Sequence, residues 1–376
     1  FYLFNPLLIF TNISHSSLCF TLLFITEAIS QVVVRKSIPR SMISLAVASY
    51  LSFTPIYLVI PVLALGHALQ VDVVEKVYAM GIALFTSTVG LLMLFSFTIT
   101  ASWQFLQSTY GTIVLFDKIS PNVGLWWYLF TEMFVFFTPF YIGIFNLYQF
   151  VFIIPITLRL FEYHSPNKQT STPVSRIVVD EHGNVKSINP ETGEVTDISG
   201  LLPKSSTASG ATTHETDAIK RDQQPIPPPS KSSETYPELA KSDEDHESCV
   251  VGDSFLAIVL CYTWLSFTKS YPTVGDLGFA ISLLPIFRST VLPYCKYPLV
   301  SGLTLLICLL LSPIFYYCWI VLGNGNSNFF YSINLIWGVV HALIMVDVLW
   351  AKLTLDYIAQ NKVPADKVDK LRLTQI

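Results

Sequence analysis

Charged residues are scarce in this sequence. They make up 13% of its 376 residues, whereas hydrophobic residues make up 52% and aromatic residues 14%, and the mean hydropathy is +0.53. A soluble protein of this length could not cover so much apolar surface. Runs of about twenty apolar residues match the roughly 30 Å hydrocarbon core of a bilayer. The composition therefore predicts an all-α polytopic membrane protein.

Cysteine provides no framework for a disulfide-rich fold or a metal site. Six cysteines are present, without a CxxC pair or a zinc-ligand spacing. His15 and Cys19 are four residues apart and could share a helix face, but a thiol nucleophile also needs an orienting third group. The sequence has no Ser–His–Asp order and no phosphate-binding glycine loop. We therefore expect no catalytic residues, no metal and no cofactor.

An initiator methionine and the features of a signal peptide are also missing, since the chain begins FYLFNPLLIF. We expect a fragment whose beginning is missing. The apolar runs 253–268 and 272–287 are short and joined by Pro272, which indicates tilted, re-entrant or half-helices. The candidate spans, by apolar length, are 16–34, 41–65, 77–100, 124–142, 143–161, 253–268, 272–287, 298–322 and 329–351.

The segment 165–252 differs from the rest in composition. Between 165 and 248 there are 14 acidic and 8 basic residues, a net charge of −6, so the remainder of this −4 chain carries +2. Its many Ser, Thr and Pro residues predict disorder, although RIVVDEHGNVKSINPETGEV could form a small hairpin. We predict four regions: membrane helices in 1–164, a polar cytosolic insert in 165–252, membrane helices in 253–352 and a cytosolic tail in 353–376.

Basic residues in short loops mark the cytosolic side of a membrane protein. If the spans alternate, one side holds the insert together with Arg35, Lys36, Arg40, Arg159, Arg288, Lys296 and Lys352. The opposite side, which we expect to be lumenal, then holds the loops 67–76, 269–276 and 324–328.

Two polar loops bordered by aromatic residues interrupt the apolar sequence, KSYPTVGD (269–276) and NGNSNFF (324–330). A lysine could meet a phosphate, and asparagine amides can donate and accept hydrogen bonds without carrying charge, which suits sugar hydroxyls. We hypothesise one lumenal site for a lipid with a large polar head, against the alternative of two tight turns. Its candidate residues are Lys269, Tyr271, Asp276, Asn324, Asn326, Asn328, Phe329 and Phe330.

A few ionisable residues lie in apolar surroundings. Glu132 is expected mid-span, as a contact with a ligand or another subunit or as a polar tie between helices. His341 and Asp347 are six residues apart, so they do not share a helix face. Asp347 and Lys352 are best explained by a helix end that reaches the membrane interface. The aromatic residues around Asp117 and Lys118 fit an interfacial belt.

Several motifs in order resemble the PIG-U family: SWQFLQSTYG (102–111), SPNVGLWWYLFTEMF (120–134), FTKSYPTVGD (267–276) and GNGNSNFFYSI (323–333). The resemblance covers nearly all of the chain outside the insert. It implies a non-catalytic, multi-pass subunit of the GPI transamidase in the endoplasmic-reticulum membrane. It also implies a fold similar to the polytopic glycosyltransferases that use dolichol-phosphate sugars, with the family's N-terminal spans absent here.

The resemblance further implies that the cysteine-protease chemistry belongs to another subunit, and that this chain recognises or presents the GPI lipid. The expected partners are that subunit, the other transamidase subunits, the GPI lipid and the membrane, with no nucleic acid. The alternative is a polytopic mannosyltransferase using a dolichol-phosphate sugar, which needs an acidic residue in the first lumenal loop. A transporter would show internal repeats, and we find no convincing repeat.

We predict that the insert is dispensable for the membrane fold, because long polar surface insertions add little loop-closure entropy. Deleting residues 170–248 should leave complex assembly and surface levels of GPI-anchored proteins near their normal values, measured by co-purification and flow cytometry. Loss of the assembled complex would show that the insert is not a passive loop.

Overall fold

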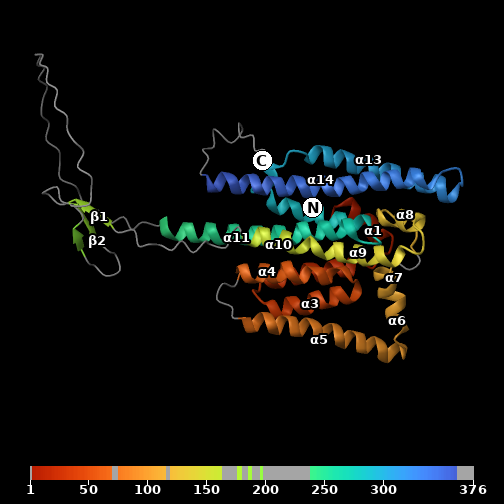
Figure 1. Ribbon diagram of the computed structural model, residues 1–376, viewed down its shortest axis with the longest axis horizontal. Helices are drawn as coiled ribbons and strands as arrows, with labels where there is room; N and C mark the ends of the chain where they lie inside the picture. The colour runs from red at the N-terminus through yellow and green to blue at the C-terminus, as the bar shows by residue number, and fades with distance from the viewer. Residues whose placement is uncertain are drawn as a thin grey trace, which may run out of the picture. The chain divides into compact units, whose positions relative to one another are not determined.

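The computed structural model describes residues 2–69, 75–115, 119–162, 176–179, 185–188, 195–197 and 238–361. The chain divides into two compact units, Phe1–His164 with Asp243–Ile376, and Ser165–Ser242. The first unit is a bundle of helices that run roughly along one direction (Figure 1). Four helices in the described ranges are long and apolar enough to cross a membrane: Lys76–Thr100, Thr138–Phe161, Pro298–Val321 and Ser327–Gln360.

The N-terminal part of the bundle is built from short helices and one long one. They are α1 (Pro6–Ile13), α2 (Leu18–Val33), α3 (Ile38–Leu51), the 3₁₀ turn η1 (Thr54–Leu58), α4 (Val59–Leu69) and α5 (Glu75–Thr100). Apolar residues of α2, α3, α4, α11 and the start of α10 form most of the largest core cluster.

The predicted span 41–65 is wrong, because α3 and α4 form a helical hairpin. The chain becomes extended at Ser52, and Pro55, which has no N–H to donate, starts a 3₁₀ turn. Gly66, near the end of α4, packs on Ile38 at the start of α3, so the two helices are antiparallel. As a result, the end of α4 lies beside the end of α2 rather than across the bundle.

Four short helical pieces follow, and after them α9 and α10 together form one long apolar segment. The elements are α6 (Gln104–Leu106), the π-helical turn η2 (Gln107–Gly111), α7 (Thr112–Val114), α8 (Trp126–Glu132), α9 (Thr138–Val151) and α10 (Ile153–Glu162). The predicted spans 124–142 and 143–161 are therefore wrong in their bounds. Pro139 occupies the first turn of α9, where its missing N–H costs nothing, so a single span, Thr138–Phe161, replaces them.

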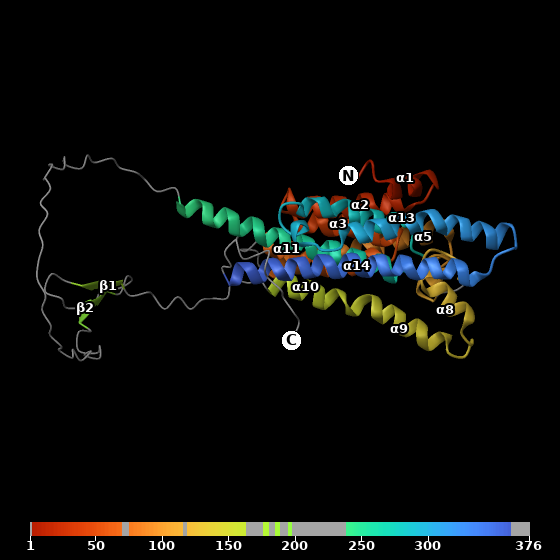
Figure 2. The same cartoon turned by 90° about the horizontal axis from the view of Figure 1, so that it is seen from above.

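The second part of the bundle ends with an antiparallel pair of long helices. Its elements are α11 (Glu238–Thr268), α12 (Val274–Leu283), the 3₁₀ turns η3 (Leu284–Phe287) and η4 (Leu292–Tyr294), α13 (Pro298–Tyr316), the π-helical turn η5 (Tyr317–Val321) and α14 (Ser327–Gln360). Figure 2 shows α13 and α14 side by side, and their contacts form a third cluster around Cys308, Ile333 and Trp337.

The end of α11 and the start of α12 meet partway along α14, as half-helices would. Ser266, just before the turn that joins them, lies 3.0 Å from Nε2 of His341. His341 is fourteen residues after the start of α14, which is about 21 Å along the helix axis. The turn of residues 269–273 therefore faces the same end as the turn before α14, but lies much deeper in the bundle.

In the second unit, the described residues form a three-stranded antiparallel sheet of order β1-β2-β3. The strands are β1 (Arg176–Val179), β2 (Val185–Ile188) and β3 (Val195–Asp197). The small hairpin that the sequence allowed as an alternative to disorder is present, with Val179 paired with Val185. Most of the insert, for which we predicted disorder, lies outside the described residues, as do Asp117 and Lys118 and residues 362–376.

One end of the bundle, which we call the basic end, gathers the basic residues that the sequence grouped together. The ring of His67 at the end of α4 packs edge-to-face against the ring of Phe161 of α10, and their centroids are 5.2 Å apart. Arg159 lines a cavity with Asp356 near the end of α14. Because α3 and α4 form a hairpin, the end of α4 also lies here, so the prediction that the loop 67–76 begins on the opposite side is wrong. The other end, which carries the turn 322–326, we call the turn end.

Lys352 is fully buried near the basic end, where its ammonium group has two carboxylate partners. Its Nζ lies 2.5 Å from Oδ2 of Asp253 and 2.5 Å from Oδ1 of Asp356. Asp347 has a separate role, since its carboxylate accepts hydrogen bonds from the backbone N–H groups of Lys296 and Tyr297 and so fixes the start of α13. The prediction that Asp347 and Lys352 mark one helix end at the interface is wrong, since α14 continues to Gln360.

Replacing Lys352 should destabilise the bundle, because it leaves two buried carboxylates without their cation. We expect Lys352→Met to cost about 3–5 kcal/mol, measured as a lower unfolding midpoint of the purified protein in detergent. Lys76→Met, at an exposed lysine of α5, is the matched control and should change the midpoint little. Equal midpoints for the two variants would show that the buried ion pairs add nothing to stability.

Candidate functional site

The turn between α11 and α12 separates two cavities. Thr273 lines one, of about 210 Å³, and the adjacent Val274 lines the other, of about 500 Å³. We call the first the hydroxyl cavity, because eight of its twelve lining residues carry hydroxyl groups. The second, the apolar cavity, is lined mainly by apolar side chains of α13 and α14.

Asp276 fixes the shape of this turn. It is 2% exposed, and its Oδ2 accepts hydrogen bonds from the backbone N–H and the hydroxyl of Thr273, forming a capping box at the start of α12. Its Oδ1 accepts from the hydroxyl of Tyr262 at 3.2 Å. Lys269 completes the arrangement, with its Nζ 3.2 Å and 3.3 Å from the two carboxylate oxygens.

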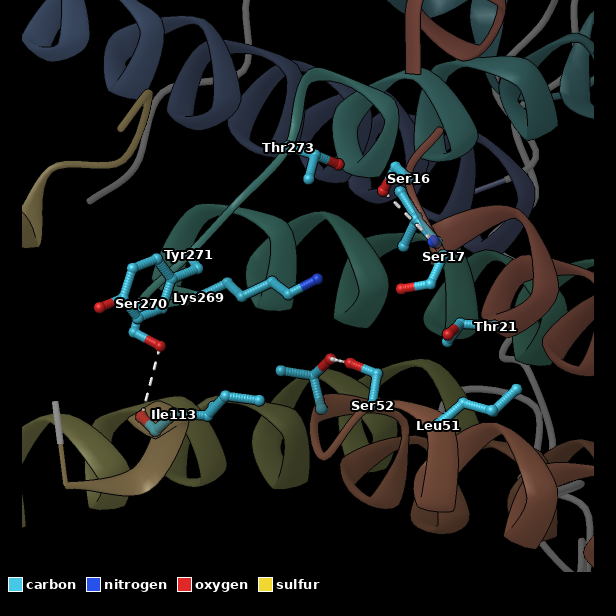
Figure 3. A pocket seen from close by; sticks show the side chains of 12 residues that line it. Ser16, Ser17, Thr21, Leu51, Ser52, Ile113, Lys269, Ser270, Tyr271 and Thr273 are labelled. Carbon is cyan, nitrogen blue, oxygen red and sulfur yellow. Dashed lines mark hydrogen bonds between the residues drawn. The ribbon is translucent and has the colours of Figure 1, made fainter. Parts of the chain in front are cut away.

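The predicted residues of the first loop therefore have different positions. Lys269 and Tyr271 line the hydroxyl cavity (Figure 3). Asp276 is enclosed behind them and has its oxygens occupied, which makes it a positioning residue. Since Lys269 already has a carboxylate partner, its ammonium group has only part of its hydrogen-bonding capacity left for a ligand.

A hydrogen-bonded clamp joins the turn to α14 and to the loop before α8. Asn122 donates from Nδ2 to the carbonyl of Ser270 at 3.3 Å, and its Oδ1 accepts from the N–H of Gly124 at 2.7 Å. Asn334, 1% exposed on α14, donates to the carbonyls of Asn122 and Gly124. A Cβ atom on Gly124 would lie 2.8 Å from the ring of Pro272, so only glycine fits there.

Asn122 and Asn334 also line the apolar cavity, and our sequence analysis did not select either of them. The available signals were an asparagine in the turn sequence SPNVG and an amide within the apolar run of α14. A polar side chain inside an apolar helix is expected to face a partner or a cavity. These two residues provide the polar groups of a cavity otherwise lined by residues such as Cys308, Pro313 and Phe330.

Local structure explains most of the asparagines and both glycines in GNGNSNFF (323–330). Gly323 has a φ of +65°, which suits glycine, and a Cβ on Gly325 would lie 3.0 Å from the backbone of Trp319. Asn326 caps α14, its side chain accepting from the N–H of Asn328. Asn328 in turn accepts a hydrogen bond from the hydroxyl of Tyr128 in α8 at 2.5 Å.

The remaining residues of this turn differ in exposure. The Asn324 side chain is exposed, Phe329 is 59% exposed and Phe330 only 3%. Phe330 lines the apolar cavity and packs near Trp127 of α8, with their ring centroids 5.9 Å apart. The predicted lipid-site residues are thus divided among the hydroxyl cavity, the apolar cavity and the turn, instead of sharing one cavity.

Glu132 does not lie mid-span as predicted. It is the last residue of the seven-residue helix α8, and its side chain is exposed. It borders a hollow with Leu129, Phe134 and Phe137. Its surroundings are therefore an exposed aromatic surface at the turn end rather than the interior of the bundle.

His15 lies in a turn and His341 lies inside the bundle. His15 precedes α2 in a turn with a φ of +56°, so it does not share a helix face with Cys19 as the sequence suggested. His341 is 1% exposed and has partners for both ring nitrogens, Ser266 and the carbonyl of Trp337. Among the described residues, no group of three or more potential metal ligands is present.

Comparison with known proteins identifies relatives of the whole chain. A family model described as GPI transamidase subunit PIG-U matches residues 1–178 and 247–337. The GPI transamidase component GAB1 of Saccharomyces cerevisiae is 32% identical over 377 residues, covering 100% of this chain and 70% of the relative. The GPI-anchor transamidase components PIGU of Mus musculus and Homo sapiens are 24% and 23% identical, covering 95% of this chain.

The chain spans only 62% of the length of the mouse and human relatives. Even so, the family match includes all four motifs on which the resemblance rests, since they lie within 102–111, 120–134, 267–276 and 323–333. It also includes the turn between α11 and α12 and the start of α14, which border the apolar cavity. The matches favour a transamidase subunit over the mannosyltransferase alternative, and they show that this chain belongs to the PIG-U family of GPI transamidase subunits.

Proposed function

We propose that this chain acts as a non-catalytic subunit of a GPI transamidase complex and recognises the GPI lipid through the apolar cavity. The observation that carries this proposal is a cavity of about 500 Å³, lined by α13 and α14, with two asparagines on its wall. Ligand sites in proteins commonly have volumes of about 300–1,000 Å³, an apolar lining and a few placed polar groups.

The position of the cavity suits a ligand that arrives from the bilayer. One of its walls is α13, a helix that is apolar enough to span a membrane and whose residues are mostly not buried by the rest of the bundle. Leu303, Leu306 and Leu310 of α13 are more than half exposed. Acyl chains could therefore lie along α13, while the lipid's polar part approaches Asn122 and Asn334.

The rest of the proposal concerns orientation and partners. The basic end would face the cytosol, because basic residues favour that side, and the turn end would face the lumen of the endoplasmic reticulum. Glu132 and the exposed aromatic residues around it would contact another subunit of the complex. Within the same proposal, the overall fold is similar to that of the polytopic glycosyltransferases that use dolichol-phosphate sugars.

Catalysis would belong to the cysteine-protease subunit. Cys295, outside the membrane spans, has a pKa raised to about 11 by burial and by the nearby charge of Asp347, so its thiol stays protonated at neutral pH. Cys19 donates a weak hydrogen bond to the carbonyl of Ser16 and has no histidine on its helix face. These surroundings support a chain without a thiol nucleophile.

Filling the apolar cavity should weaken the use of GPI. Ser312 of α13 lines the cavity, so Ser312→Phe places a large ring where the lipid would lie. We expect the GPI concentration at half-maximal transfer to rise about tenfold or more in assays of the purified complex, with assembly measured separately.

Thr304→Phe is the matched control for this substitution. Thr304 is a half-exposed residue of the same helix that does not line the apolar cavity, and its hydroxyl donates to the carbonyl of Val300. This variant should keep the normal GPI dependence. If Ser312→Phe assembles normally and uses GPI like the control, the apolar cavity is not the lipid site.

Replacing the cysteines should leave the chemistry intact. We expect a variant with all six cysteines changed to serine or alanine to support transfer within about twofold of the normal turnover when assembled in the complex. Normal assembly combined with a complete loss of turnover would assign a chemical role to a thiol of this chain.

A further inference from the structure

The hydroxyl cavity lies on the other side of the α11–α12 turn from the apolar cavity and is not used by the proposed function. Its walls are the start of α2, the bend between α3 and η1, and the turn itself, as Figure 3 shows. Apart from eight hydroxyl-bearing residues, it is lined by Lys269 and three aliphatic residues. Such a lining binds a polar group and not an acyl chain.

Thr21 provides the first indication of a missing ligand. Its side chain is only 4% exposed, it lines the cavity, and within the described residues its hydroxyl forms no hydrogen bond. A hydroxyl that faces a cavity and has no partner in the protein can still donate and accept a hydrogen bond. Figure 3 shows it on the cavity wall opposite Lys269, so a ligand in the cavity could satisfy it.

The start of α2 provides the second indication. Ser17 is the N-cap residue, but its side chain forms no capping hydrogen bond with this 16-residue helix. The N–H of Leu18 has only a long contact, 3.3 Å, with the hydroxyl of Ser16. Because the first N–H groups of a helix lack partners within the helix and carry partial positive charge, they favour an anion.

Lys269 adds a positive charge on the opposite side. Its contacts with Asp276, at 3.2 Å and 3.3 Å, engage two directions of an ammonium group that has three donors. Figure 3 shows its amine and the Ser17 hydroxyl pointing toward each other across the cavity. Asp276 itself does not line the cavity, so a ligand would meet the lysine without meeting the carboxylate.

We infer that the hydroxyl cavity binds a phosphate ester, held by Lys269, the start of α2 and the hydroxyl of Thr21. A volume of about 210 Å³ suits a phosphate with a small attached group rather than a whole glycan. The phosphate could come from a lipid headgroup or from a soluble phosphate compound, because both present the same oxygens. This inference is independent of the proposed function, because it concerns a separate cavity.

The test uses the purified complex and radiolabelled dioctanoyl phosphatidylinositol as the probe. Dioctanoylglycerol, which lacks the phosphate, should compete poorly for its binding, whereas unlabelled probe should compete fully. Competition by inorganic phosphate or by glycerophosphoinositol would identify the phosphate or the headgroup as sufficient. Full competition by dioctanoylglycerol would overturn the inference, because it would show that the chains alone determine binding.

Thr21→Val tests the site without disturbing the fold. The change keeps the shape and removes an unpartnered hydroxyl, so the unfolding midpoint should stay the same or rise. Probe binding should weaken about three- to tenfold, as expected for the loss of one hydrogen bond. Thr26→Val is the matched control, since Thr26 lies on the same helix and bonds to the carbonyl of Leu22. Normal probe binding by Thr21→Val would overturn the inference.

Removing Lys269 alone would leave Asp276 without its cation, so the second variant is the double change Lys269→Met with Asp276→Asn. It keeps the site neutral, and the asparagine can still cap α12. We expect a loss of probe binding greater than that of Thr21→Val, because charge-assisted hydrogen bonds are the stronger ones. Unchanged binding in this folded variant would also overturn the inference. Any share of the probe that binds the apolar cavity should be lost in Ser312→Phe and kept in Thr21→Val, so failure of this inference is distinguishable from failure of the proposed function.

Discussion

The carboxylate of Asp276 holds the turn on which both cavities depend. It ties the start of α12 to Thr273, to Tyr262 of α11 and to Lys269, all around one buried side chain. Since residues 273 and 274 line different cavities, the position of this turn sets the boundary between a hydroxyl-rich space and an apolar one. A buried carboxylate with this many partners is expensive to disturb, because any lost partner leaves a charge desolvated.

The depth of the turn follows from helix length. The apolar part of α11, Gly252–Thr268, and the helix Val274–Phe287 are each shorter than a membrane span, whereas α14 has 34 residues. The two short helices therefore end partway along α14 and bring polar groups to that depth. Backbone and side-chain polar groups there need partners within the protein, and the clamp formed by Asn122 and Asn334 provides them.

The π-helical turn η5 and the glycines after it have a related role. They end α13 so that the chain can reverse and begin α14 with Asn326 as its cap. Tyr128, stacked on Tyr331 with ring centroids 4.3 Å apart and bonded to Asn328, then holds α8 against this turn. The aromatic residues that the sequence assigned to an interfacial belt thus also form the packing between α8 and the long helix pair.

Composition and apolar run length were sufficient to predict a helical membrane protein and the long spans α5, α13 and α14. These two features were sufficient because the thickness of the membrane sets the length of a spanning helix, so an apolar run of that length is interpreted as a transmembrane helix. The hairpin of α3 and α4 could not be predicted in this way, since its combined apolar length equals that of one span. Likewise, the sequence marked Lys269 and the asparagines as polar residues in an apolar setting. Only the tertiary structure showed that Asp276 pairs with Lys269, that Asn326 and Asn328 form hydrogen bonds at the start of α14, and that Thr21 and Asn334 line cavities. Hydrogen-bond partners distant in the sequence decide those roles, and they become neighbours only when the helices pack.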